Sequence, residues 1–480
     1  MADAFRKPGR KVVLVVTLIG VVAGVALSSA RAQDDQPGPK FLNLRFDEDF
    51  SYLDGEEGSY IADRSDLLKN IRLGDDWRLD LGGEFRIRME ARSNAAFGAA
   101  ARTQNTQQFY RWMLHADIKY RNLFRVFVQG IVAHAEDQDT GFNPLHENHG
   151  DLQQLFFDIH FLGEDVPWYF RVGRQELQYG NQRLVSPLDW ASTRRRFDAV
   201  KLVYAGDPWH VEGFYAKPVD IPQVQRKQRD RYNEGYDFAG IYATYSGIPN
   251  HGLDLYAFAI DRTQDTVNPN GNVGDQSIFT LGSRFWGRTG QFDYEAELSG
   301  QWGKWAGDTV QAWSWTLDGG YTFDFACKPR IGAGFDWASG DDNPADGTVG
   351  TFNQMFPLGH KYFGYLDLIG RQNITAVNVN LSAWAVPNKV KTKLAYHTFW
   401  LTEEEDALYN AGGAATLRDP TGGSGQEVGQ ELDLTILWKI NVHSSVLFGY
   451  SHFWEDNFVH STVGGDDDPD FYYLQYQYKF

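Results

Sequence analysis

The sequence predicts an all-β fold: a transmembrane antiparallel β-barrel of about 18 strands, with short periplasmic turns and long extracellular loops. Three observations lead to this prediction. An unusually long alternating segment begins at residue 77, short and long connections follow one another along the chain, and the last ten residues form an aromatic strand.

Residues 77–92, WRLDLGGEFRIRMEAR, alternate between apolar and charged side chains. Successive side chains of a strand point to opposite faces, so Leu79, Phe85 and Ile87 share one face, whereas Arg86 and Arg88 share the other. The segment is about twice as long as a usual strand of a soluble sheet. An apolar face toward lipid and a charged face toward an aqueous interior account for this pattern.

Similar alternating segments recur to the end of the chain. Eight tight turns, such as Arg121-Asn122 and Pro387-Asn388, join them on one side, and nine further links join them on the other. Most of the nine are long, for example 178–196 and 339–372, while the link near Lys304–Val310 is short. These connections predict eighteen strands, and an even number places both chain ends in the periplasm.

The final segment, FYYLQYQYKF, ends at Phe480 and resembles the C-terminal assembly signal of bacterial outer-membrane barrels. The alternative is a soluble β-sandwich with an aromatic core. A single core could not bury the apolar faces of eighteen strands, so the barrel is the better interpretation.

The first 32 residues have the features of a secretory signal peptide. A positive region contains Arg6 and Lys7, an apolar stretch covers Val12 to Leu27, and Ala30-Arg31-Ala32 fits a cleavage site. An N-terminal transmembrane anchor is the alternative. We therefore predict a signal peptide over residues 1–32 with cleavage near Ala32, a periplasmic lead-in over 33–76, and the barrel over 77–480.

The overall charge argues against a nucleic-acid partner. The formal charge is −18, and residues 1–32 carry five cations and one anion, so the remaining chain has a formal charge of about −22. Cys327 is the only cysteine, which excludes a disulfide framework. The mean hydropathy of −0.45 is compatible with a barrel because half of each strand is polar.

No catalytic motif stands out, so we predict neither an enzyme nor a bound cofactor. His146, Glu147 and His149 lie in a predicted outer loop, where solvated side chains are a simpler interpretation than a metal site. No metal site is predicted.

The most informative charged residues are basic side chains on the predicted inner face. Rings of Arg and Lys favour anionic permeants, because guanidinium and ammonium groups attract carboxylates. Interleaved acids such as Glu84 and Asp117 leave open that individual arginines pair with them to stiffen the wall. The basic loop Arg194-Arg195-Arg196 and Arg183 are expected to fold over or into the same pore. The inward set comprises Arg86, Arg88, Arg111, Lys119, Arg125, Arg284, Lys391 and Lys393.

Three stretches resemble the alginate export family of outer-membrane porins: residues 63–92, residues 171–203 and the segment HKYFGYLDLIGRQNI at 360–374. The resemblance implies an eighteen-stranded barrel that passes a uronic acid polysaccharide through an arginine-rich constriction. It also implies pore or pore-loop positions for Arg174, Arg183, Arg196 and Asp198, although the alternation near residue 173 leaves the facing of Arg171 and Arg174 open.

The expected function is that of an outer-membrane channel that passively exports an anionic, alginate-like polysaccharide. A porin for sugars or small anions, and an outer-membrane enzyme with a site at the rim, are the alternatives. The expected partners are the polysaccharide, outer-membrane lipid and lipopolysaccharide, and periplasmic secretion proteins. Nucleic acid is not expected among them.

Overall fold

The computed structural model describes residues 40–53, 64–98, 104–136, 143–222, 229–463 and 467–480. The predicted signal peptide, residues 1–32, lies outside the described residues. The same holds for residues 33–39 and 54–63 of the predicted lead-in.

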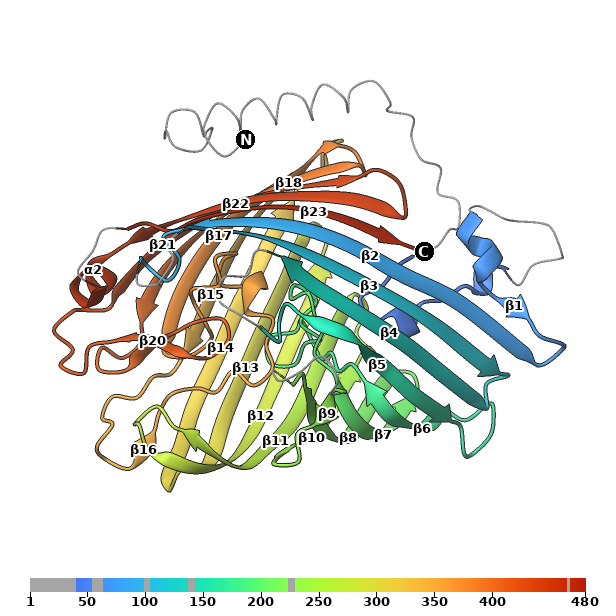
Figure 1. Ribbon diagram of the computed structural model, residues 1–480, viewed down its shortest axis with the longest axis horizontal. Helices are drawn as coiled ribbons and strands as arrows, with labels where there is room; N and C mark the ends of the chain where they lie inside the picture. The colour runs from blue at the N-terminus through green and yellow to red at the C-terminus, as the bar shows by residue number, and fades with distance from the viewer. Residues whose placement is uncertain (1–39, 54–63, 99–103, 137–142, 223–228, 464–466) are drawn as a thin grey trace.

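Eighteen antiparallel strands form a closed barrel, which confirms the predicted fold class (Figure 1). Each wall strand pairs with the next, and β2 closes the barrel by pairing with β23 from Glu84 opposite Lys479 to Ser93 opposite Asp470. The predicted first strand, 77–92, corresponds to β2. The wall strands are β2 (Trp77–Ser93), β3 (Gln104–Tyr120), β4 (Phe124–Glu136), β5 (Asn148–Ile159), β6 (Trp168–Gln175), β7 (Phe197–Ala205), β8 (Trp209–Asp220), β10 (Tyr236–Tyr245), β11 (His251–Val267), β12 (Val273–Thr289), β13 (Phe292–Trp305), β14 (Asp308–Thr322), β15 (Arg330–Ala338), β17 (Ile374–Val386), β18 (Val390–Leu401), β21 (Glu427–Lys439), β22 (Ser444–Glu455) and β23 (Asp470–Lys479).

The two faces of the wall differ as the alternation predicts. On β2 and β3 the apolar side chains of Met89 and Leu114 are 45% and 64% exposed, whereas Arg88 and Arg111 are 1% and 0% exposed. Across the barrel, Leu317 of β14 is also about half exposed. The apolar face is therefore the outer face, where hydrocarbon would cover it, and the charged face is turned inward.

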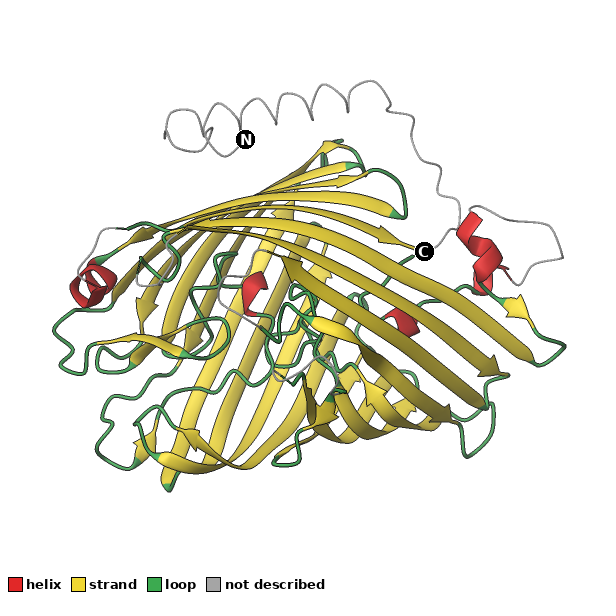
Figure 2. Ribbon diagram, viewed as in Figure 1, coloured by secondary structure: helices red, strands yellow, loops and turns green. Residues whose placement is uncertain are grey.

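Short additional elements lie in the N-terminal segment and in the connections between wall strands (Figure 2). Among the described helices, none is both long and apolar enough to cross a membrane. The additional strands are β1 (Ile71–Arg72), β9 (Arg231–Tyr232), β16 (Thr348–Val349), β19 (Ala407–Tyr409) and β20 (Ala415–Arg418), and the helical turns are η2 (Arg45–Asp47), η3 (Ser51–Leu53), η4 (Arg64–Leu68), η5 (Gly359–Lys361) and α2 (Asn457–Val463).

Part of the predicted periplasmic lead-in, including η2, contacts the inner side of the barrel wall. The Phe46 ring packs against the inward rings of Phe127 and Phe156, at centroid distances of 5.9 and 5.2 Å. Arg45 donates hydrogen bonds to the carbonyl oxygens of Gly83 (2.9 Å) and Phe480 (3.0 Å), next to the barrel seam. The sequence predicts a periplasmic lead-in over 33–76, and within it the segment around Arg45 and Phe46 reaches the inner side of the wall, because its apolar and basic side chains find buried partners there.

Two long loops, 176–196 and 339–373, also fold inward and meet each other. The main chain at Val185 bridges to Phe356, and the amide nitrogens of Phe356 and Leu358 donate to the carbonyl oxygens of Leu184 (2.9 Å) and Gln182 (3.0 Å). The loops share an apolar core with inward side chains of the wall, and its buried members include Leu177, Val185, Phe197, Phe214, Phe238, Phe258, Phe352, Phe356, Phe363 and Ile369. This core narrows the interior, which an alternation pattern of single strands cannot show.

Candidate permeation pathway

Three of the predicted inward arginines bind the loop 176–196 to the wall. Arg86 donates to the carbonyl oxygens of Asp189 (2.6 Å) and Ala191 (2.5 Å). Arg111 forms ion pairs with Glu84 and with the Asp189 carboxylate, the latter at 2.7 Å. Arg88 donates to the carbonyl oxygen of Trp190 (2.6 Å), and its guanidinium lies 4.0 Å from the centre of the Trp190 ring.

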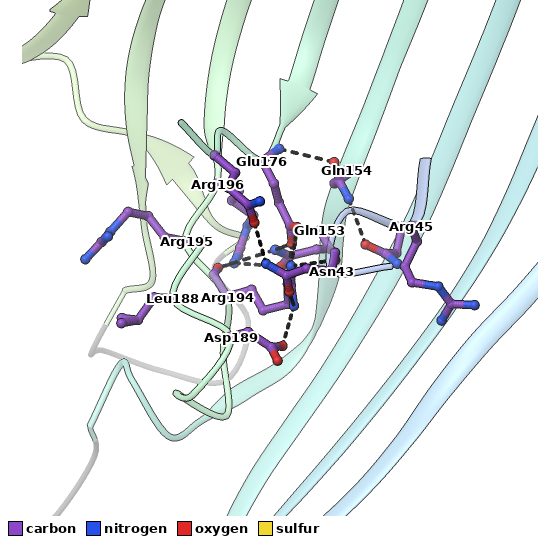
Figure 3. A network of polar contacts seen from close by, with 12 residues as sticks. Asn43, Arg45, Gln153, Gln154, Glu176, Leu188, Asp189, Arg194, Arg195 and Arg196 are labelled. Atoms are coloured by element: carbon purple, nitrogen blue, oxygen red, sulfur yellow. Dashed lines mark hydrogen bonds and ion pairs between the residues drawn. The ribbon is translucent and has the colours of Figure 1, made fainter. Parts of the chain in front are cut away.

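Arg194 makes a second set of contacts at the base of the same loop (Figure 3). Its Nε and Nη2 atoms each lie 2.6 Å from the Glu176 carboxylate, and its Nη1 atom pairs with Asp189. It also donates to the carbonyl oxygen of Asn43 (3.0 Å), in the N-terminal segment. Burial raises the pKa of the Asp189 carboxyl, but the positive charges of Arg111, Arg194 and Arg86 outweigh it, so the pKa lies well below its usual value.

The other predicted arginines of the interior are paired as well. Arg183 forms ion pairs with Glu295 and Glu297 and lies 4.5 Å from the centre of the Tyr362 ring. Arg284 pairs with Asp254 (2.6 Å) and Glu295 (2.5 Å). These contacts neutralise both guanidinium groups by direct ion pairs.

Two basic residues near the periplasmic ends of β3 and β4 share one acid. Arg125 binds Asp117 through two hydrogen bonds of 2.7 Å, and the Lys119 ammonium lies 3.2 Å from Asp117 and 3.3 Å from Asp80. At the loop end of β7, Arg196 is buried and pairs with Asp230. The alternative that inward arginines pair with wall acids therefore describes most of the set.

Arg174 and Asp198 lie on the outer face of the wall, so the inferred pore position does not fit them. They share the face of Val172 and Val200, which are 41% and 45% exposed, and they form an ion pair of 2.7 Å across β6 and β7. Arg171 is the inward residue of this strand, since it is buried and paired with Asp158 at 2.7 Å. The pairing is regular through Gly173, and the facing could not be decided from the alternation because arginines occupy both faces of this short strand.

The interior also contains lysines that, unlike most of the arginines, have no carboxylate partner among the described residues. Lys391 and Lys393 of β18 lie on the inner face with Ala395 and His397, as predicted. Among the described residues, no carboxylate forms an ion pair with Lys391, Lys393, Lys439 or Lys361. These four lysines are called the unpaired lysines below.

Two of the unpaired lysines were not among the predicted site residues. Lys439 ends β21 and has the same facing as Asp433, so the alternation contained the information needed to find it. Lys361 lies in η5 of the inward loop, and only the tertiary fold places it in the interior. Its ammonium group donates to the side-chain and main-chain oxygens of Asn181, in the opposite loop.

A cavity of about 270 Å³ lies between the first inward loop and the wall. Aromatic side chains and hydrogen-bonding groups of both signs surround it, which is typical of sites for polar ligands with some apolar surface. Its lining residues are Gln178, Tyr179, Gly180, His210, Glu212, Tyr242, Thr244, Asp254, Arg284 and Trp286.

The described residues contain no group of three or more His, Cys, Asp or Glu side chains arranged to hold a metal ion. His146 instead packs against the ring of Phe109 at 4.7 Å. Burial lowers its pKa to about 4, so the imidazole is neutral at pH 7.

Comparison with known proteins identifies the family. Residues 77–472 match the sequence family described as alginate export. The chain belongs to the alginate export family. None of the curated proteins matches it.

Several crystal structures share the barrel of this alginate export family member. OpdO of Pseudomonas aeruginosa is 12% identical and has a TM-score of 0.57, with 84% of this chain and 97% of that chain covered. OccK2 (OpdF) of P. aeruginosa in complex with glucuronate is 11% identical, with a TM-score of 0.55 and coverage of 84% and 98%. OccAB2 of Acinetobacter baumannii is 11% identical, with a TM-score of 0.54 and coverage of 83% and 98%. Because the sequences are only 11–12% identical, the similarity shows that the fold is porin-like and says nothing about the permeant. Family and fold together support an outer-membrane channel.

Proposed function

We propose that the protein is a passive outer-membrane channel, without enzymatic activity, that exports an anionic polysaccharide of uronic acid residues. The observation that carries this proposal is the set of unpaired lysines, three on the barrel wall and Lys361 in an inward loop. Acidic residues outnumber basic ones by 63 to 45 in the chain, so these lysines do not lack partners because carboxylates are scarce. The family description supports a uronate polymer as the permeant.

Lysine suits a permeant that must keep moving. Its ammonium is a compact, hydrated charge on a flexible stem, whereas the arginine fork binds a carboxylate through two parallel hydrogen bonds. Conduction requires sites that attract the permeant weakly and at several places in succession. The wall arginines bind wall acids or an inward loop, and the lysines remain to attract the carboxylates of a polymer.

The inward loops and the N-terminal segment occupy part of the interior, so in this proposal the polymer passes as a single extended chain. The same narrowing favours the second candidate, a porin for single uronates or other small anions. The structurally similar OccK2 was crystallised in complex with glucuronate, which is a property of that protein. The outer apolar face would contact lipid and lipopolysaccharide, and periplasmic secretion proteins would deliver the polymer.

Planar-bilayer recording separates the two candidates. We expect anion-selective conductance that a uronic acid polymer interrupts at concentrations where the monomeric uronate does not, because several lysines act on one chain. A conductance that prefers cations and ignores the polymer would contradict the proposal. Interruption by monomer and polymer at equal uronate concentration would favour the small-anion porin.

The anion selectivity should also depend on pH, because the ammonium group of Lys361 titrates near neutral pH. Burial, together with the positive charges of Arg183 and Arg284, lowers the pKa of the Lys361 ammonium to about 8. Because the charged form is lost as pH rises through this value, anion selectivity should fall between pH 7 and pH 9. Reversal potentials in a KCl gradient measure this change. In the Lys361→Met variant the same pH change should have less effect, and an equally steep response in that variant would assign the titration to another group.

A further inference from the structure

At the periplasmic end of the interior, one aromatic side chain lies within about 6 Å of two of the unpaired lysines. Trp384 lies on the inner face of β17, directly opposite Lys391 of β18. Lys391 is in turn opposite Leu437, two residues before Lys439 at the end of β21. The Nζ atoms of Lys391 and Lys439 are 5.8 and 5.2 Å from the centre of the Trp384 ring.

This arrangement stabilises two ammonium groups without neutralising them. The electron-rich face of an indole ring attracts a cation within about 6 Å. Unlike a carboxylate, however, the ring carries no net charge, so both positive charges act on the solution at the mouth of the barrel. Elsewhere in the interior, cations such as Arg125 and Arg171 are paired with acids at 2.7 Å.

The cluster continues toward the centre of the barrel. Lys393 follows Lys391 on the same face of β18, farther from the short turn, and Lys361 lies beside Asn181 where the two inward loops face each other. The unpaired lysines therefore extend from the end with the short turns toward the contact between the two inward loops.

We infer that Trp384, Lys391 and Lys439 form the capture site for the polymer at the periplasmic mouth. The inference rests on the proposed function, and it names the ligand as carboxylate groups of a uronic acid polymer that enters from the periplasm. The two ammonium groups attract the first carboxylates, and the ring of Trp384 keeps the ammonium groups near each other. Lys393 and Lys361 then take over the same carboxylates in turn.

The test is the frequency of blocking events when polyuronate is added to one side of a bilayer that holds channels of known orientation. In the double variant Lys391→Gln/Lys439→Gln, the frequency for polymer added on the short-turn side should fall at least about tenfold, because local charge governs capture. The frequency for polymer added on the loop side should stay within about twofold, since electrostatic attraction is screened over roughly 10 Å of salt solution. Trp384→Leu should lower the frequency from the short-turn side by a smaller factor.

Lys328→Gln is the matched control, because Lys328 lies in a short turn at the same end but pairs with Asp324 and is exposed on the surface. It should leave the frequency unchanged. Lys391→Arg/Lys439→Arg should restore capture, which separates a loss of charge from a loss of folding. If polyuronate blocks the wild-type protein and the glutamine variant equally often, or if Lys328→Gln is as effective, the capture site is refuted while the proposed function stands. If polyuronate blocks the wild type from neither side, the proposed function fails and this inference with it.

Discussion

The Arg194→Ala variant is expected to conduct ions severalfold better than the wild type and with frequent fluctuations. Arg194 binds Glu176, Asp189 and Asn43, so its removal takes away most of the contacts between the base of the loop 176–196 and the N-terminal segment, leaving the hydrogen bond from Asn43 to Gln178. Removing one partner from a buried ion pair costs about 3–5 kcal/mol, because the remaining charge is buried without compensation. The loop should then leave its position in the interior. Single-channel conductance measures the wider path, and amide hydrogen exchange over residues 176–196 measures the release.

Arg121→Ala provides the comparison for this experiment. Arg121 pairs with Asp76 at 2.8 Å in an exposed turn, where ion pairs contribute little to stability. The conductance and the amide hydrogen exchange of the Arg121→Ala variant should match those of the wild type. If Arg194→Ala also keeps wild-type conductance and amide protection, the loop is held by its apolar core with Phe356 and Phe197, and the arginine contacts are dispensable.

The double variant Lys361→Glu/Lys393→Glu is expected to lose anion selectivity and polyuronate block together. One unit charge roughly 6 Å from an ion changes its energy by about 3 kcal/mol at an effective dielectric constant near 20. Salt in the lumen weakens this effect, so we expect the permeability ratio of chloride to potassium to fall about tenfold. Reversal potentials and polymer block in the same bilayers measure both quantities.

Lys304→Glu makes the same charge change at a different place. Lys304 lies near the loop end of β13, on the outer face with Trp302, and donates to the Thr309 hydroxyl at 2.7 Å. The anion selectivity of the Lys304→Glu variant should stay close to that of the wild type. A comparable loss of selectivity in Lys304→Glu would show that total charge, and not the interior lysines, controls the permeant.

The alternation of side chains was sufficient to predict the wall and much of its chemistry. Arg86, Arg88 and Arg111 lie on the inner face as expected, and the predicted turns define the eighteen strands. Side-chain facing follows from the local backbone geometry of a strand, so it is readable wherever the pattern is regular. On β6 both faces carry an arginine, so the alternation alone is ambiguous, and the pairing of β6 with β7 decides that Arg171 faces inward and Arg174 outward.

The partners of the inward charges could not be predicted in the same way. Arg86 binds a carbonyl oxygen 103 residues away, in a loop whose path depends on its apolar core. The same fold brings Phe46 into the interior and places Lys361 beside Asn181. Sequence spacing carries no information on contacts of this range.

The sequence by itself determined the barrel, its strand number and the face on which each regular strand carries its charges, because these depend on a two-residue repeat and on turn length. Only the tertiary structure decided which of those charged side chains have a partner of opposite charge. The wall acids and the inward loops bind the arginines, whereas no described carboxylate lies within ion-pair distance of Lys361, Lys391, Lys393 or Lys439, so no direct partner compensates their positive charges.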